Sequence, residues 1–584
     1  MSHPRFLNHR VLLVFTFILL GSIHAYRSSP TTDEIGFMAA GLCHWETARF
    51  EAFAVNPPLI RMLATLPLVP MLPVTDWGTH IPSVAARPEG QYGYDFLQNN
   101  RDNLQHYYFV SRMVCLLLSA VGLYTACHWA GELFGTKASY VVGLLWVFSP
   151  MMIAHGSLMT PDAGAASLGT LAFFLFRRWL ISCSLIDAFV FGSSVGLALS
   201  TKFTWLLVLP PSFVVLWFVW RFNHHVFRSR LRRDSFHIAV AILCSMVVIN
   251  AMYGFDRTFL PLGKIPFISG TLAPTETQNI QNENRFSGTW MGLIPMPFPV
   301  CLLQGIDTQK SSFEKTGQSR SYLMGRWKSG GWWYYYLVGF FVKSPMPVLA
   351  LGFIACVTVL GLSRQWRNKL WRPREAPRNE LFSELMLLAL PAICVFVFVS
   401  LETGFNRHLR YVLPAYPFVF ILISQVVTAQ TAWIRMLIRP LLVLQVVSVL
   451  WHGPHWLSYF NELTGGPKRG GEWMLVSNVD WGQDFYYLRL WQEKYPEVGP
   501  LKVLIENQAD LELYGVKMKK IHIIPKVTSQ ISGWYAVGVN ILYGHGQLPG
   551  NGSEDVNQLK HLQPTDWAGY SIRIYHVEEV QKTE

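Results

Sequence analysis

The chain has 584 residues, of which 51% are hydrophobic and 14% aromatic, while only 14% carry a charge. This composition is too apolar for an ordinary soluble protein and predicts a polytopic membrane protein. The net charge of +12 is high enough for nucleic-acid binding. The basic residues nevertheless cluster in short segments between apolar runs, as topology signals do, so we expect no nucleic-acid partner.

Apolar runs of about 17 to 25 residues predict about eleven transmembrane helices. They lie near 10–27, 107–130, 138–156, 163–181, 186–201, 203–221, 236–254, 333–362, 382–401, 411–428 and 437–455. The segments richest in Arg and Lys are "RRW" at 177, "RFNHHVFRSRLRRD" at 221 and "RQWRNKLWRPREAPR" at 364. All three fall on the cytoplasmic side if the amino terminus is cytoplasmic, which predicts a multi-pass protein of the inner (plasma) membrane.

Two long loops, 28–106 and 255–332, then lie on the outer face and complete a membrane domain of residues 1–455. The run "NPPLIRMLATLPLVPMLP" at 56 contains many prolines and predicts short re-entrant or interfacial helices instead of a span. From residue 456 to 584 the sequence predicts an extracytoplasmic α/β domain. It has short β-prone runs ("KVLIEN", "KKIHIIP", "WYAVGVNILYG", "YSIRIYHV") and one amphipathic helix in "DFYYLRLWQEKY".

Acidic side chains follow the first span and precede the predicted helix at 163–181. Asp33 and Glu34 lie in "SSPTTDEIGFMAAG", and Asp162 lies in "GSLMTPDAGAASLG". Each carboxylate could simply stabilise the start of a helix. Because Asp33 and Asp162 are expected on the same side and at the same depth, the alternative interpretation is that they converge on one pocket.

Cationic side chains are expected on the same face. They are Lys202 in "ALSTKFTW", Lys343 in "GFFVKSPMP", and Arg407, His408 and Arg410 in "ETGFNRHLRYVLPAYPF". Such groups can bind a phosphate at the level of the lipid headgroups. They can also extend toward ordinary anionic lipids. Cations facing carboxylates predict a lipid phosphate as the leaving group and an acid as the base.

Taken in order along the chain, these motifs resemble the polytopic glycosyltransferases that use polyprenyl-phosphate sugars, namely the protein O-mannosyltransferase and lipid A aminoarabinose transferase family in its bacterial form. The motifs that carry the resemblance are "TTDEIGFMAAG", "NPPLIRMLATLP", "MTPDAGAAS", "GGWWYYYLVGFFVKSPMPVL", "RHLRYVLPAYPF" and "YFNELTGGPKRGGEWMLVSNVDWGQDFYYL". The resemblance implies an all-α membrane domain of the GT-C-like type that carries the α/β domain at its carboxyl end.

The resemblance also implies roles for individual residues. Asp33 matches the catalytic base, with Glu34 beside it, and Asp162 matches a second acid of the site. Arg407 and Arg410 match the residues that contact the donor phosphate, and Lys202 matches less closely. Some relatives have Lys or His before the Pro-Pro of the first loop. This chain has Asn56, which can hydrogen-bond a phosphate or sugar but adds no charge.

The predicted reaction moves a sugar from an undecaprenyl-phosphate-like carrier to a hydroxyl of a protein, lipid or glycan acceptor on the outer face, with inversion at the anomeric carbon. No cofactor is expected. No metal is expected either, the alternative being a divalent ion held by Asp33, Glu34 and Asp162. Two other functions stay open: a transporter in which buried charges line the path, and a catalytically silent lipid-binding scaffold.

Overall fold

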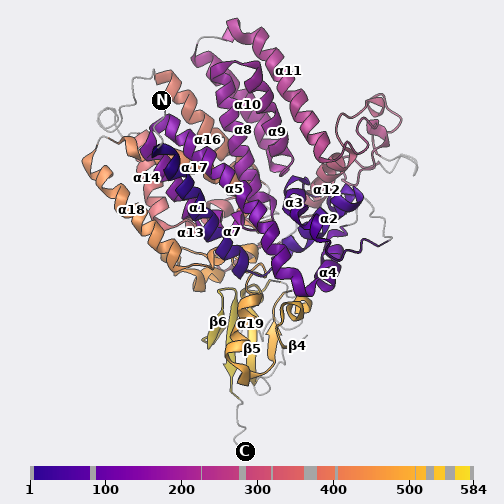
Figure 1. Ribbon diagram of the computed structural model, residues 1–584, viewed down its shortest axis with the longest axis vertical. Coiled ribbons are helices and arrows are strands. Elements are labelled where there is room, and N and C mark those ends of the chain that lie inside the picture. Colours follow the sequence, from indigo (N-terminus) through magenta and orange to yellow (C-terminus); the bar gives the residue numbers. More distant parts are fainter. Residues whose placement is uncertain are drawn as a thin grey trace, which may run out of the picture.

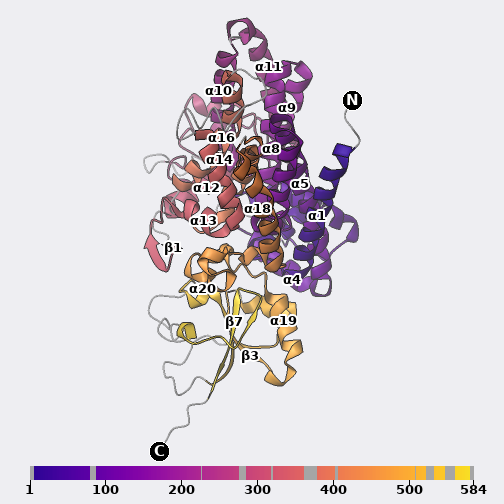
Figure 2. The same cartoon turned by 90° about the vertical axis from the view of Figure 1, so that its left-hand side faces the viewer.

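The computed structural model of the protein describes residues 5–78, 87–224, 227–274, 284–316, 320–360, 378–401, 406–429, 431–506, 508–520, 532–545 and 559–578. A bundle of long helices forms most of the molecule, and a small β-sheet lies at one end of it in both views (Figures 1 and 2). Most of the predicted basic segment at 364–378 and of the β-prone run "KKIHIIP" lies outside the described residues.

Seven helical segments in the described residues are long and apolar enough to cross a membrane. They are α1 (Arg5–Arg27), α5 (Leu104–Phe134), α10 (Thr204–Asn223), α11 (Phe227–Met252), α16 (Arg378–Leu401), the segment that joins η7 (Leu409–Ala415), α17 (Tyr416–Ser424) and η8 (Gln425–Thr428), and α18 (Ala432–Trp451). The predicted polytopic, mostly helical membrane domain is therefore confirmed.

Two further predicted spans are bent helix pairs. The pair α6 (Thr136–Val147) and α7 (Pro150–Gly156) is bent by 64°, and the pair α13 (Tyr335–Lys343) and α14 (Met346–Leu360) by 117°. Each break lies next to a proline, Pro150 or Pro345, which cannot continue the hydrogen-bond ladder of the preceding helix. The count of candidate spans rises to nine if each pair is one span.

The remaining two predicted spans are helices, but one is too short and the other not apolar enough to count as a candidate membrane span. Helix α9 (Leu185–Leu199) has 15 residues, about 22 Å at 1.5 Å per residue, whereas the hydrocarbon core is roughly 30 Å thick. Helix α8 (Pro161–Ser182) has 22 residues, but its Gly, Ser and Thr residues and its two arginines make it less apolar.

The small residues of α8 allow it to pack closely in the bundle. A Cβ atom built on Gly122 of α5 would lie only 2.4 Å from the Ser167 hydroxyl of α8, and one on Gly169 would lie 1.9 Å from the Trp205 ring. Side chains as small as these let helix backbones approach within a membrane. The amino-terminal end of α8, which carries Asp162, is thereby held against α5 and α10.

The first long loop consists of short helices, as the prolines of its "NPPLIRMLATLPLVPMLP" run predict. Its elements are α2 (Thr32–Thr47), η1 (Phe50–Phe53), α3 (Leu59–Thr65), η2 (Leu66–Met71), α4 (Glu89–Asn99) and η3 (Arg101–Asn103). The second long loop holds η4 (Leu262–Lys264), η5 (Met291–Leu293), α12 (Val300–Thr316) and an antiparallel hairpin of β1 (Arg320–Leu323) and β2 (Arg326–Ser329).

Within the described residues, the carboxyl-terminal sheet has five strands in the order β4-β3-β5-β7-β6. The strands are β3 (Leu501–Leu504), β4 (Met518–Lys520), β5 (Gly533–Gly538), β6 (Asp566–Ala568) and β7 (Ile572–Val577). β3 pairs in parallel with β4 and β5, and β7 pairs antiparallel with β5 and β6. The predicted helix is α19 (Phe485–Lys494), and the second half of "WYAVGVNILYG" is not strand but the short helix α20 (Val539–Leu542).

The stretch between α18 and α19 runs in short 3-10 turns: η9 (Trp456–Ser458), η10 (Glu462–Thr464), η11 (Pro467–Glu472) and η12 (Val476–Asn478). Its apolar side chains belong to the same buried core as the membrane helices, among them Trp456, Phe460, Met474 and Trp481. This stretch therefore lies between the bundle and the sheet, where it contacts both.

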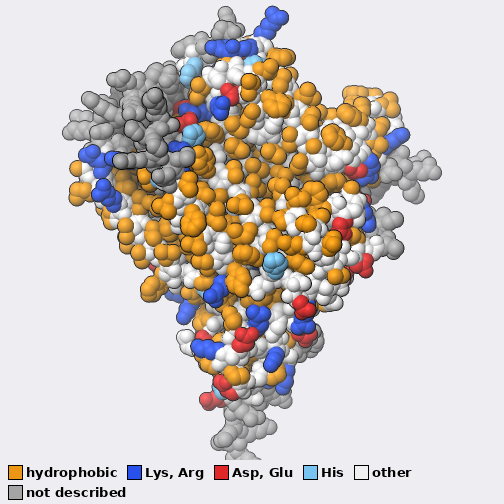
Figure 3. Space-filling view, in the orientation of Figure 1, with side chains coloured by type: hydrophobic (Ala, Val, Ile, Leu, Met, Phe, Trp, Pro, Cys, Tyr) orange, Lys and Arg blue, Asp and Glu red, His pale blue; other side chains and the backbone are white. Residues whose placement is uncertain are grey.

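The surface agrees with this arrangement. Hydrophobic side chains cover the broad middle of the molecule, while Lys, Arg, Asp and Glu gather over the sheet end and the opposite end (Figure 3). Exposed apolar residues such as Phe15, Phe189, Ile242 and Val443 project from four different helices. An exposed apolar surface of this extent fits contact with lipid, and the chain is a multi-pass membrane protein.

Candidate active site

Arg410 bridges the two aspartates that the sequence singles out. Its Nη2 donates to Asp33 Oδ2 over 2.7 Å, and its Nη1 donates to Asp162 Oδ2 over 3.0 Å. Lys202 Nζ donates to the other oxygen of Asp162 over 2.5 Å. Four residues from distant parts of the sequence thus form one network of two carboxylates and two cations, which we call the charge network.

The local sequence explains where the carboxylates lie. Asp33 is in the first turn of α2, and Asp162 is in the first turn of α8 directly after Pro161. The positive end of each helix dipole favours a carboxylate there. Lys202 lies in the turn between α9 and α10, so all of these side chains approach from helix ends.

The two aspartates differ in their access to water. The side chain of Asp33 is 38% exposed, whereas that of Asp162 is fully buried. Burial alone would raise the pKa of the Asp162 carboxyl, but Lys202 and Arg410 together hold it well below its usual range. Asp162 is therefore an ionised anchor for the two cations, and Asp33 is the carboxylate that solvent or a substrate can reach.

Aromatic rings enclose the cations of the charge network. The Arg410 guanidinium carbon lies 4.2 Å from the centre of the Trp481 ring, and Lys202 Nζ lies 4.7 Å from that of Tyr411. A cation over an aromatic face is attracted by the ring quadrupole. The rings also exclude water, which strengthens the electrostatic interactions inside.

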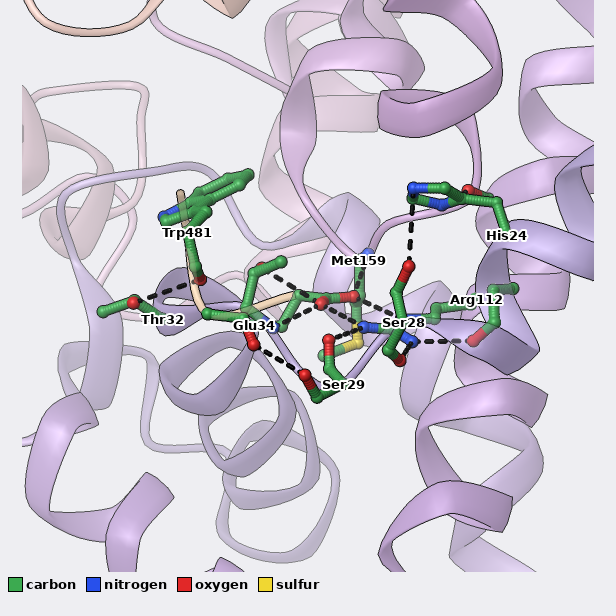
Figure 4. A network of polar contacts seen from close by, with 12 residues as sticks. His24, Ser28, Ser29, Thr32, Glu34, Arg112, Met159 and Trp481 are labelled. Atoms are coloured by element: carbon green, nitrogen blue, oxygen red, sulfur yellow. Dashed lines mark hydrogen bonds and ion pairs between the residues drawn. The ribbon is translucent and has the colours of Figure 1, made fainter. Parts of the chain in front are cut away.

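Glu34, although adjacent to Asp33, belongs to a separate and sealed network (Figure 4). Arg112 of α5 donates to both its oxygens, over 2.8 and 2.6 Å, and the backbone N–H groups of Thr31 and Met159 also donate to it. Burial by itself would raise the pKa of Glu34, but Arg112 and these hydrogen bonds lower it. Both side chains are almost fully buried. Glu34 therefore links the first loop to α5 and to the segment before α8 through hydrogen bonds, and it lies away from solvent.

The other predicted cations do not join the charge network. Lys343 is buried and donates to two backbone carbonyls, those of Leu457 and Asn478, over 2.7 and 2.5 Å. The His408 ring bonds the Ser477 hydroxyl over 2.6 Å, and burial lowers its pKa well below the usual range. A neutral imidazole cannot supply a positive charge to a phosphate.

Arg407 and Asn56 also have their contacts outside the charge network. Arg407 lines a small separate pocket with Arg320, Trp327 and His545. The half-buried Asn56 accepts a hydrogen bond on its backbone oxygen from Arg61, whose guanidinium also bonds the carbonyls of Pro57 and Phe53. This fully buried arginine stabilises the "NPPLIR" turn by donating to three of the carbonyls around it.

The sequence did not single out two residues that contact the predicted acids and cations, Arg112 beside Glu34 and Trp481 beside Arg410. Arg112 lies inside the predicted span 107–130, and a charge at membrane depth is a signal that could have identified it. Trp481 lies in the quoted motif "VDWGQD", but nothing in the sequence indicates that its ring meets Arg410 across 71 positions of the chain.

The same geometry bears on metal binding. In the residues that the structure describes, no group of three or more His, Cys, Asp or Glu side chains is arranged to hold a metal ion. Asp33 and Asp162 instead contact cations of the chain itself. The expectation that no metal takes part stays a prediction.

Comparison with known proteins supports the family resemblance. Residues 104–253 match the family described as dolichyl-phosphate-mannose-protein mannosyltransferase. The match confirms the predicted resemblance to membrane glycosyltransferases, and with it the prediction of an enzyme of this class. The matched region runs from α5 to α11 and contains Arg112, Asp162 and Lys202.

Solved structures give weaker similarity. The chain is 13% identical to ArnT from Cupriavidus metallidurans bound to undecaprenyl phosphate, with 98% of each chain covered and a TM-score of 0.44. It is 12% identical to the apo oligosaccharyltransferase of Archaeoglobus fulgidus, with 92% of this chain and 72% of that chain covered and a TM-score of 0.37. No curated protein matches the sequence.

Proposed function

We propose that the protein transfers a sugar from a polyprenyl-phosphate carrier to an acceptor hydroxyl, with inversion of the anomeric carbon. The observation that carries the proposal is the charge network, in which Arg410 joins a solvent-accessible carboxylate to a buried one at a helix end beside the membrane. The match of residues 104–253 to a family named for a lipid-phosphate sugar supports this class of donor.

Arg410 and Lys202 would bind the donor phosphate. Asp162 holds both cations at one point, and Arg410 Nε has no hydrogen-bond partner among the described residues although the side chain is almost entirely buried. A guanidinium with a free donor suits a phosphate oxygen, since charge-assisted hydrogen bonds to phosphate are among the strong ones. As the bond between C1 and the phosphate oxygen breaks, the departing polyprenyl phosphate keeps the electron pair, and the cations stabilise its added charge.

Asp33 would take the acceptor proton. In the absence of substrate its carboxylate is paired with Arg410, and an incoming phosphate competes for the same guanidinium. Donor binding would thus free Asp33 as the acceptor hydroxyl arrives from water. The acceptor oxygen then attacks C1 from the face opposite the phosphate while Asp33 receives its proton, so a single displacement inverts the anomeric carbon.

The carboxyl-terminal sheet is proposed to lie outside the plasma membrane. The stretch that leads into the sheet contacts the charge network through Trp481. The connection between α10 and α11 lies at the opposite end of the bundle (Figure 1), and Arg221 and Arg230 on either side of it line a pocket with His224 and Glu384. A Cys at exposed Glu497 should react with a membrane-impermeant maleimide in sealed cells, and one at exposed Ser235 only after lysis, each compared with the wild-type chain. The reverse labelling pattern would contradict the orientation.

The deciding experiment for the activity is sugar transfer by the purified protein. Radiolabelled sugars on undecaprenyl phosphate are offered with hydroxylated protein, lipid and glycan acceptors, and the product is separated from the donor. We expect label in at least one acceptor class that disappears in Asp33→Asn. Transport of the labelled donor into vesicles without transfer would favour a transporter, and donor binding without either process would favour a lipid-binding scaffold.

A further inference from the structure

Residues 477–484, with the sequence "SNVDWGQD", cross the site between the bundle and the sheet; we call this segment the strap. One side of the strap is bonded to the first loop. Thr32 N–H donates to the Trp481 carbonyl over 3.1 Å, Ser29 N–H donates to the Gln483 carbonyl over 3.0 Å, and the Ser29 hydroxyl donates to the Gly482 carbonyl over 2.6 Å (Figure 4). The strap thereby holds the turn that precedes Asp33.

The other side of the strap is bonded to the segment that leads into Arg410. The Asn478 side chain accepts from the Leu409 N–H over 2.9 Å and donates to the Arg407 carbonyl over 2.7 Å. Ser477 bonds the His408 ring. The backbone on both sides of the Asp33–Arg410 ion pair is therefore fixed by a single short stretch of chain.

Trp481 lies at the centre of the strap, and its ring faces the Arg410 guanidinium at 4.2 Å. Its backbone N–H donates to Gln483 Oε1 over 2.7 Å, and Gln483 in turn donates to the Ser458 hydroxyl and the Val479 carbonyl. Gly482 has a φ of +88°, a left-handed conformation that suits glycine and turns the chain directly after the tryptophan. The backbone that carries the indole is thus fixed on both sides of Trp481.

We infer that Trp481 is a positioning residue, which orients the plane of the Arg410 guanidinium for the donor phosphate. The carboxylates of Asp33 and Asp162 occupy the two Nη groups, but edge contacts alone leave the guanidinium free to tilt about them. An aromatic ring with its centre 4.2 Å from the guanidinium carbon restricts that freedom and shields the cation from water. The inference rests on the proposed function, because it assigns Trp481 a role in donor binding through Arg410.

The test is a double-mutant cycle on the full-length protein in detergent, with the dissociation constant for undecaprenyl phosphate as the readout. The variants are Trp481→Leu, Arg410→Lys and the combination. Trp481→Phe keeps an aromatic face, and Trp534→Leu makes the same change in the sheet, where the side chain is half-buried and packs on Trp491. Thermal unfolding of each variant is followed in parallel.

We expect Trp481→Leu to weaken undecaprenyl phosphate binding roughly tenfold, the size of a desolvated cation–π contact. Trp481→Phe should retain most of the affinity, and Trp534→Leu all of it. In the Arg410→Lys background, which lacks the planar guanidinium, Trp481→Leu should have less than about a twofold further effect.

An equal loss from Trp481→Leu in both Arg410 backgrounds would overturn the inference, as would wild-type affinity in Trp481→Leu. If Trp481→Leu does not fold, Trp481→Met replaces it in the same cycle, because Met also removes the aromatic face but fills more of the buried space. Failure of the wild-type protein to bind undecaprenyl phosphate would instead count against the proposed function, which keeps the two failures apart.

Discussion

Asp33 and Glu34 are neighbours in the chain, yet the fold gives them opposite environments. Asp33 is 38% exposed and shares Arg410 with Asp162. Glu34 is fully buried, and Arg112 and two backbone N–H groups satisfy its oxygens. Consecutive residues at a helix start point about 100° apart, so one carboxylate faces the site and the next one faces the bundle.

This difference assigns the two neighbouring carboxylates different roles: Asp33 is available for reaction, and Glu34 stabilises the fold. A carboxylate whose oxygens are all satisfied in a buried pair is held for structure, because breaking that pair would leave an uncompensated charge. A carboxylate with one cationic partner and access to water can exchange that partner for a substrate. Four predictions test this division, beginning with the largest expected effect.

Arg112→Ala should sharply destabilise the protein, because it leaves the Glu34 carboxylate buried without its partner. Removing one member of a buried pair costs on the order of 3–5 kcal/mol, which corresponds to a fall of about 2–4 °C in the unfolding midpoint of a chain of this length. The measurement is thermal unfolding in detergent, with Asp33→Asn as the matched control. Similar midpoints for the two variants would remove the distinction between the networks.

Asp33→Asn should abolish most of the sugar transfer and leave the fold intact. Thr31 is the N-cap of α2 and Asp33 lies in the first turn behind it, so Asn removes only a helix-dipole contribution of about 0.3–1 kcal/mol. Asn cannot accept the proton, so turnover should fall roughly 10²-fold or more. Binding of undecaprenyl phosphate should persist. Near-normal transfer would show that Asp33 serves only the start of α2 and that another group acts as the base.

Arg410→Ala should weaken use of the donor more than Arg407→Ala does. Arg410 belongs to the charge network, and losing its hydrogen bonds to a charged partner should cost about 1.5–3 kcal/mol. Arg407 lines a different pocket, so its replacement tests whether both arginines of the "RHLR" motif contact the phosphate. The readout is the KM for the donor, and equal increases for both variants would place Arg407 in the site as well.

Asp480, within the strap, should give the smallest effect and a characteristic pH dependence. Its burial, with Glu506 and Asp484 nearby, raises the pKa of the carboxyl to about 8, far above the value of roughly 3.9 in an unfolded chain. The folded protein thus retains a proton that the unfolded chain releases, so stability should fall as the pH rises from about 4 toward 8 and then level off.

Asp480→Asn should flatten this dependence and raise the unfolding midpoint at pH 8 by about 1 °C, the shift expected for roughly 1 kcal/mol in a chain of this length. The comparison is a series of thermal unfolding curves between pH 5 and pH 8.5, with Asp566→Asn in the sheet as the control. Parallel curves for the wild-type protein and Asp480→Asn would show that Asp480 does not carry the proton.

Much of the architecture follows from local sequence. Apolar runs predicted the long spans, prolines predicted the short helices of the first loop, and the amphipathic stretch at 484–495 predicted α19. The strand prediction was wrong where tertiary contacts override the local pattern. The run "WYAVGVNILYG" turns from β5 into α20 at the point where Asn540 bonds the backbone at Val476 and Asp480, contacts that an extended strand pattern does not reveal.

The sequence by itself determined the chemical inventory of the site: carboxylates at two helix starts, and cations beside the later spans. Only the tertiary structure decided which of them meet. Lys202 and Arg410 reach Asp162, whereas Lys343, equally placed by sequence, bonds backbone carbonyls. The reason is that charge pairing in a membrane bundle depends on how distant helices pack, and Arg410 lies 248 positions from Asp162, a separation across which no local pattern carries information.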